Sequence, residues 1–128
     1  MSPPLAGPLS EEERAFFQEG CNLFNEGRFW HAHEAWEAMW NGLKRRHAPD
    51  QEILLVQGLI QTAALLLHHQ RRNVPGVTKQ WEKLQPKLAG WATAWDLDIH
   101  RHLGAVNRYV EDVGTWSLVA AEHQLPKA

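Results

Sequence analysis

Residues 51–72 most constrain the fold, because aliphatic side chains cover nearly the whole circumference of the helix that they predict. These side chains are Ile53, Leu54, Leu55, Val56, Leu59, Ile60, Leu65, Leu66 and Leu67. A helix that is apolar on every side is stable in water only when neighbouring elements surround it. Its most apolar stretch is short and is interrupted by Gln61 and Thr62, which argues against a membrane span. We therefore expect this helix at the centre of a folded domain.

A capping box predicts where the first helix begins. Ser10 stands three residues before Glu13, a spacing at which each side chain can bond to the other residue's backbone amide. Gly27 suits the C-terminal end of that helix. The preceding residues 1–9 hold three prolines and one glycine. We expect them to form a flexible, unpacked arm ahead of a single domain over residues 10–128.

Similar start and stop signals predict the remaining helices, over residues 29–46, from Asn73 onward, from Asp96 or Asp98 to Val113, and, as a short last segment, over residues 116–121. Pro86 must kink or end the helix that begins at Asn73, because proline removes an amide donor and clashes with the preceding turn. No stretch alternates between polar and apolar residues as a strand would. The sequence predicts an all-α fold, a compact orthogonal bundle of five or six helices.

Composition narrows the function. The 128 residues suit one domain, and 13 Lys and Arg against 15 Asp and Glu give a net charge of −2. Without a basic excess we expect no nucleic-acid partner and no anionic membrane surface as partner. The only cysteine, Cys21, cannot form an intramolecular disulfide, which favours the cytoplasm. An unidentified small molecule or protein is left as partner, and a homodimer stays open.

A narrow polar stripe interrupts the predicted central helix. At about 100° per residue, Gln57, Gln61 and His68 fall within a sector of about 40°. Each buried polar group without a partner costs about 1–3 kcal/mol, so this stripe must face partners or water. The helix over residues 29–46 offers partners in His33 and Glu37, which stand one turn apart.

We expect the two helices to bring these side chains into one polar cluster, walled by Trp30, Trp36 and Trp40, with Glu34 slightly further round. Three interpretations stay open. The cluster is a hydrogen-bond network that fixes helix register, a pocket for a small ligand, or a metal or acid–base site.

The first two interpretations describe a non-enzymatic binding or scaffold domain with no cofactor. The third describes a metal-dependent hydrolase or similar enzyme that holds a divalent metal ion with His33, Glu37 and His68, with Glu34 nearby. The HExxH zinc motif is absent, since Glu37 stands where that motif has its second histidine.

Three segments resemble one known family. FNEGRFWHAHEAWEAMW over residues 24–40, QGLIQTAALLLHH over 57–69 and RRNVPG over 71–76 are similar to the domain-of-unknown-function 309 family, and the resemblance extends over about residues 13–90. It implies a compact helical bundle and no particular reaction. Its characteristic positions, together with the polar stripe, give the predicted binding or network residues: His33, Glu34, Glu37, Trp40, Gln57, Gln61, His68 and Asn73. Pro86 departs from the family pattern, which leaves the course of the fourth helix open.

Overall fold

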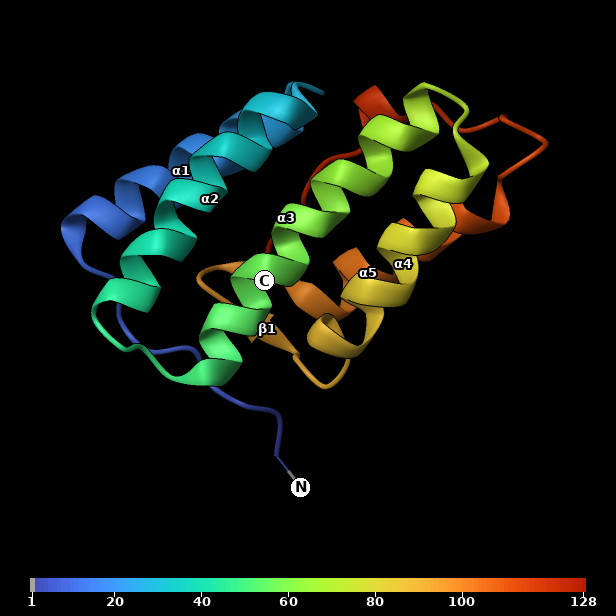
Figure 1. The fold of residues 1–128 in the computed structure, drawn as a ribbon. Coiled ribbons are helices and arrows are strands. Elements are labelled where there is room, and N and C mark those ends of the chain that lie inside the picture. Colours follow the sequence, from blue (N-terminus) through green and yellow to red (C-terminus); the bar gives the residue numbers. More distant parts are fainter. Residues whose placement is uncertain (1) are drawn as a thin grey trace.

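Five α-helices and one small hairpin make up the computed structural model, which describes residues 2–128 (Figure 1). The helices are α1 (Glu11–Asn25), α2 (Phe29–Arg45), α3 (Asp50–Gln70), α4 (Val74–Leu88) and α5 (Ile99–Glu111). Strands β1 (Thr93–Ala94) and β2 (Leu97–Asp98) pair antiparallel, and a single 3₁₀ turn, η1, spans Ala120–Glu122. The predicted helical fold class is confirmed, and η1 replaces the short last helix expected over residues 116–121.

Helix α3 runs through the middle of the molecule, between α2 and α4 (Figure 1). By length and composition alone it is apolar enough to cross a membrane. In the fold, however, α2, α4, α5 and η1 pack around it, and most of its aliphatic side chains are fully buried. This burial accounts for its apolar circumference, as the sequence predicted.

Helices α1 and α2 approach each other closely at Gly20. A Cβ atom at that position would overlap the indole of Trp36 on α2. The same indole donates a hydrogen bond from Nε1 to the carbonyl oxygen of Phe17, at 3.2 Å. Glycine is therefore needed on α1 for the close approach of the two helices.

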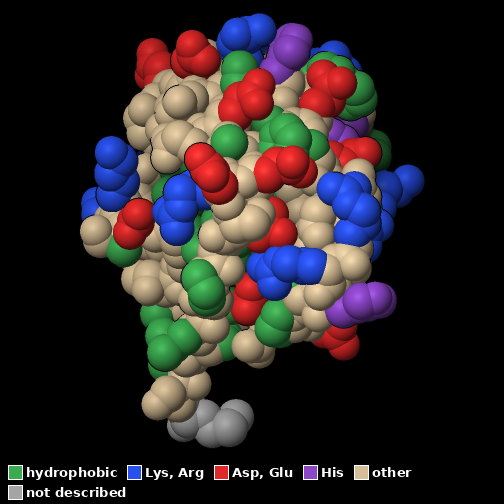
Figure 2. All heavy atoms as spheres, turned by 90° about the vertical axis from the view of Figure 1, so that its left-hand side faces the viewer, with side chains coloured by type: hydrophobic (Ala, Val, Ile, Leu, Met, Phe, Trp, Pro, Cys, Tyr) green, Lys and Arg blue, Asp and Glu red, His purple; other side chains and the backbone are tan. Residues whose placement is uncertain are grey.

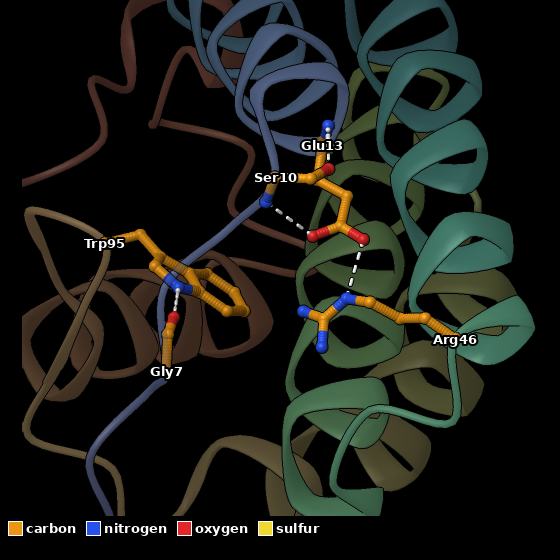
Figure 3. Close-up of polar contacts among 5 residues, drawn as sticks. All are labelled: Gly7, Ser10, Glu13, Arg46 and Trp95. Carbon is orange, nitrogen blue, oxygen red and sulfur yellow. Dashed lines mark hydrogen bonds and ion pairs between the residues drawn. The ribbon is translucent and has the colours of Figure 1, made fainter.

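The capping box at the start of α1 forms as predicted (Figure 3). The amide of Glu13 donates to Ser10 Oγ at 3.1 Å, and the amide of Ser10 donates to Glu13 Oε1 at 2.9 Å. Arg46, just beyond α2, donates from Nε to Glu13 Oε2 at 2.8 Å. This bond is the main reason that the pKa of Glu13 lies below its usual value. The cap of one helix is thus also a link to the next.

Part of the N-terminal arm packs against the domain. The carbonyl oxygen of Gly7 accepts a hydrogen bond from Trp95 Nε1 at 2.9 Å (Figure 3), and its amide donates to Glu52 Oε2 at 3.3 Å. Ala6 and Leu9 rest on the hydrophobic core. The expectation of an unpacked arm is therefore wrong for residues 6–9, because a proline-rich composition carries no information about partners supplied by residues 52 and 95.

Two local features differ from the sequence prediction. Helix α4 continues to Leu88, two residues past Pro86, so the proline lies in the last turn and does not end the helix at once. The hairpin was not predicted, because its turn residues are Trp95 and Asp96 rather than glycine or asparagine. Both adopt positive φ angles, 46° and 68°, a conformation that a tryptophan rarely takes.

The C-terminal tail closes the domain against α1. Leu125 donates its amide to Asn25 Oδ1 at 2.8 Å, and Gln124 Nε2 donates to the carbonyl oxygen of Asn25 at 2.8 Å. The ring of His123 packs edge-on against Phe24, with centroids 5.6 Å apart. The C-terminal end of α1 and the C-terminal tail, about a hundred positions apart in the sequence, are therefore joined by hydrogen bonds and ring packing.

Charges of both signs are intermixed on the face formed by α1 and α2. Figure 2 shows acidic and basic side chains interspersed there, without an extended patch of one sign. This pattern agrees with the nearly balanced composition of the chain.

Candidate functional site

A cavity of about 240 Å³ opens where α2, α3 and α4 meet. We call it the α2–α4 pocket; its lining residues are His33, Glu37, Trp40, Gln57, Ile60, Gln61, Ala64, Gln80 and Lys83. The structure thus brings together five of the residues singled out in the sequence, from both predicted helices. It adds Gln80 and Lys83 of α4, which the sequence did not indicate.

The remaining predicted residues lie elsewhere. Glu34 is exposed and does not line the pocket. His68 borders a neighbouring cavity of about 150 Å³, which shares His33 and Ala64 with the α2–α4 pocket. Asn73 caps α4 by accepting from the amide of Gly76, and its Nδ2 lies 3.2 Å from Nδ1 of His68. His68 and Asn73 therefore serve the junction of α3 and α4.

The metal site considered in the sequence analysis does not form. His33 and Glu37 are neighbours, but His68 is engaged by Asn73 in the adjoining cavity. Within residues 2–128 no group of three or more His, Cys, Asp or Glu side chains is arranged to hold a metal ion. The alternative trio of His33, Glu37 and His68 therefore does not come together, because His33 borders both cavities whereas Glu37 lines only the α2–α4 pocket and His68 only the neighbouring one.

The α2–α4 pocket is partly open to solvent, not fully buried as expected. The side chain of His33 is 25% exposed and that of Glu37 is 50% exposed. Nδ1 of His33 lies 3.6 Å from Oε2 of Glu37, longer than a hydrogen bond. Trp30 stacks on the His33 ring with centroids 5.3 Å apart, and fixes its orientation from the solvent side.

On the opposite wall, α4 supplies cations. Lys87 donates from Nζ to Gln61 Oε1 at 2.8 Å. Burial lowers the pKa of Lys87, and the nearby charge of Lys83 lowers it further. Neither lysine forms an ion pair within residues 2–128. This side of α4 therefore carries two lysines that form no direct ion pair with a carboxylate of residues 2–128.

Unpaired polar atoms concentrate at this pocket. Four buried side-chain nitrogen or oxygen atoms in residues 2–128 lack a hydrogen-bond partner: His33 Nδ1, Trp40 Nε1, Gln80 Oε1 and Glu52 Oε1. The first three belong to residues that line the α2–α4 pocket. Because an unpaired buried group costs about 1–3 kcal/mol, this cavity is where the polar groups of residues 2–128 are least well satisfied.

A fully paired polar network lies instead in the core. His102 and His123, which the sequence analysis did not select, place Nδ1 and Nε2 3.2 Å apart. Nε2 of His102 lies 3.0 Å from Thr62 Oγ1, and that hydroxyl donates to the carbonyl oxygen of Leu59 at 2.7 Å. Since the Thr62 hydrogen is used, its oxygen must accept from His102 Nε2, and Nδ1 of His102 must in turn accept from His123 Nε2.

This chain of bonds keeps both imidazoles neutral. Burial, together with the smaller effect of the adjacent His123, lowers the pKa of His102 to about 3. Burial also lowers the pKa of His123 to about 4. The network therefore joins α3, α5 and the C-terminal tail without a buried charge.

A second buried network centres on Asp112, directly after α5. Its carboxylate accepts from the amide and hydroxyl of Ser117 at 2.9 and 2.7 Å, from the amide of Leu118 at 3.0 Å, and from His69 Nε2 at 2.9 Å. These bonds, led by the Ser117 hydroxyl, hold the pKa of Asp112 well below its usual value. The carboxylate thereby organises the loop that follows α5 and ties it to α3.

One sequence signal could have suggested the core networks. Thr62 and His69 are polar residues on faces of the central helix away from the stripe of Gln57, Gln61 and His68. Their partners, His102, His123 and Asp112, lie at least 40 positions later in the chain. No local pattern links such distant residues, so the networks were missed.

One known family matches the part of the chain that supplies most of the pocket. The model of the DUF309 family, described as a domain of unknown function, matches residues 17–80, half of the chain. No curated protein and no solved structure matches the chain significantly. The matched region contains every pocket residue except Lys83, while His102, Asp112 and His123 follow it. On this match, the chain belongs to the DUF309 family.

Proposed function

We propose that this protein is a non-enzymatic binding domain, and that the α2–α4 pocket takes a small polar molecule. One observation carries the proposal: three of the four unpaired buried polar atoms in residues 2–128 belong to residues lining this cavity. A ligand that offers acceptors and donors to these atoms would recover their unmet hydrogen bonds. The pocket volume, about 240 Å³, is slightly below the usual range of about 300–1,000 Å³, which suits a small metabolite.

The geometry favours a binding role over a purely structural one. A register-fixing network would need direct bonds between the polar side chains of α2 and α3. The amide oxygen of Gln61 accepts from Lys87 instead, and His33 makes no hydrogen bond through Nδ1. The fold is held by the paired networks of His102 and Asp112, so the pocket residues are free to serve a ligand.

The proposal places the protein in the cytoplasm. Cys21 is the only cysteine and is buried, and burial raises the pKa of its thiol to about 12. Such a thiol is inert towards disulfide formation. The chain thus depends on no disulfide, which supports a reducing compartment.

A metabolite screen by protein NMR tests the binding function. Compounds that enter the pocket should shift the indole Nε1–H signal of Trp40. Ala64→Leu should abolish these shifts, because a larger side chain there fills the cavity without removing a polar group. Ala15→Leu, at an exposed position on α1, is the matched control and should bind like the parent. The proposal fails when no compound moves the Trp40 signal, or when Ala64→Leu binds equally well.

A further inference from the structure

The wall of the α2–α4 pocket nearest α4 is rich in donors. Because Gln61 accepts from Lys87 through Oε1, its Nε2 group keeps its hydrogens for a ligand. Lys83 lines the cavity and forms no ion pair within residues 2–128. Trp40 Nε1, which can only donate, is buried without an acceptor. Three donor groups of different kinds therefore belong to residues that line this one cavity.

The two lysines on this side of α4 form no direct ion pair within residues 2–128. Lys83 and Lys87 stand one helical turn apart on α4, a spacing at which like charges destabilise a helix. The charge of Lys83 adds to burial in lowering the pKa of Lys87. An anionic group placed between Lys83, Gln61 and Trp40 would relieve this repulsion and use all three donors.

The opposite part of the pocket is rich in acceptors. Glu37 contributes a carboxylate that forms no close ion pair with either lysine. Gln80 Oε1 is buried without a donor. These groups suit a ligand cation that also carries several N–H donors, such as an ammonium group.

The unpaired acceptors and the unpaired indole donor lie apart along the groove, whereas the charged side chains of Glu37 and Lys83 line it from different helices, α2 and α4. Helices α3 and α4 run antiparallel, since Gly58 near the middle of α3 meets Leu88 at the end of α4, whereas Gly76 at the start of α4 meets His68 near the end of α3. The N-terminal part of α2 lies beside the C-terminal part of α3, since His33 and Ala64 line the same cavity. His33 and Gln80 accordingly lie towards one end of the pocket, and Trp40 lies towards the other.

We infer that the ligand of the α2–α4 pocket is a small aminocarboxylate zwitterion, with its carboxylate towards Lys83, Gln61 and Trp40 and its ammonium group towards Glu37 and Gln80. This inference rests on the proposed binding function and specifies the chemistry of its ligand. The pocket has room for a molecule of a few heavy atoms beyond its two charged groups, given its volume of about 240 Å³.

A titration with matched small molecules tests the charge pattern. The zwitterions are glycine, β-alanine, 4-aminobutyrate and 6-aminohexanoate, which differ only in the distance between the two charges. The comparison compounds are butyrate, butylamine and butyramide, each with the carbon chain of 4-aminobutyrate and one charge or none. At low ionic strength, the Trp40 indole signal should report binding of at least one zwitterion about tenfold or more tighter than all three comparison compounds.

Two single substitutions then assign the ends of the ligand. Lys83→Met should weaken the best zwitterion about tenfold while leaving butylamine unchanged, and Glu37→Gln should weaken it similarly while leaving butyrate unchanged. The controls are Lys79→Met and Glu34→Gln, exposed neighbours on the same helices that lie outside the pocket. Because Lys83 and Glu37 are exposed as well, thermal melts of all four variants should stay close to the parent, apart from a small gain in Lys83→Met as its repulsion with Lys87 is removed.

The outcomes separate this inference from the proposed function. When neutral or singly charged library compounds bind and the zwitterions do not, the zwitterion inference is overturned and the binding function stands. Equal binding of butyramide and 4-aminobutyrate, or equal effects of Lys83→Met and Lys79→Met, overturns the inference too. When no compound of either set moves the Trp40 signal, the binding function and the inference fall together.

Discussion

Nε2 of His123 donates its hydrogen to Nδ1 of His102 across 3.2 Å of the protein core. Thr62 sets the direction of this bond. Its hydroxyl donates its hydrogen to the carbonyl oxygen of Leu59, so its oxygen can only accept a hydrogen bond from Nε2 of His102, which leaves Nδ1 of His102 as the acceptor. Protonation of His102 at Nδ1 would place two hydrogens between the rings. The folded state therefore resists protonation where an unfolded chain accepts it.

Acid should destabilise the protein well above the range in which carboxylates titrate. The pKa values of His102 and His123, about 3 and about 4 in the folded state, lie below the unfolded value of about 6.5. Between these values the unfolded chain binds more protons, so stability falls as pH falls. We expect a loss of roughly 3–4 kcal/mol in the free energy of unfolding between pH 7 and pH 5, measured by urea denaturation.

Two variants check the origin of this loss. His123→Gln keeps an N–H donor for His102 but cannot titrate, so the pH-dependent loss should fall by about half. His31→Gln, at an exposed position on α2, should leave the loss unchanged. A pH profile that is the same for His123→Gln and the parent would contradict the assignment to the core pair.

Removing the hydroxyl of Thr62 should leave the histidine pair without its hydrogen-bond acceptor. In Thr62→Val, His102 Nε2 is left as a buried donor without an acceptor, and we expect a loss of about 1–3 kcal/mol in the free energy of unfolding. Thr62→Ser keeps the oxygen and should recover most of that loss, apart from the missing methyl group. Both values come from urea denaturation at pH 7, and equal stability of the two variants would show that the hydroxyl is unimportant.

Alanine substitutions at two helical glycines should have opposite signs. Gly20→Ala places a methyl group against Trp36 and should cost about 1–3 kcal/mol, because the indole is fully buried and cannot yield freely. At Gly104 in α5 nothing lies within 4 Å of the added atom, so Gly104→Ala should stabilise by about 0.5–1 kcal/mol. Thermal or urea denaturation compares them directly.

Divalent metals should leave the protein unaffected. The histidines and carboxylates of the described chain do not converge in groups of three, and His33 with Glu37 alone makes a weak site. We expect Zn²⁺, Mn²⁺ or Fe²⁺ to leave the melting temperature of tag-free protein unchanged. A metal-dependent increase that is lost in Glu37→Gln would restore the hydrolase interpretation of the sequence.

The helices were predictable because their signals are local. Ser10, Asn73 and Asp98 each cap a helix by accepting from a backbone amide three residues away. The aliphatic side chains on all sides of α3 likewise predicted that this helix is buried. Gly27 adopts a φ of 77° just beyond α1, as its place in the sequence suggested.

The site was predictable only in part. Angular position on α2 and α3 placed Glu37, Gln57 and Gln61 on facing surfaces, and these residues do line one pocket. It could not show that α4 would add Gln80 and Lys83, which is a property of tertiary packing. Nor could it show that the pocket stays open while the paired polar core forms between Thr62 and residues of α5 and the tail.

The contacts between the C-terminal end of α1 and residues 123–125 can form only late in biosynthesis. Helix α1 leaves the ribosome long before Gln124 and Leu125 exist, so its C-terminal end and the part of the Phe24 ring that packs on His123 stay uncovered during most of translation. Loop closure over such a span is entropically costly and slow compared with helix formation. The nascent chain therefore cannot complete its interior until translation has passed residue 125, and before that it exposes an aromatic surface that chaperones can recognise.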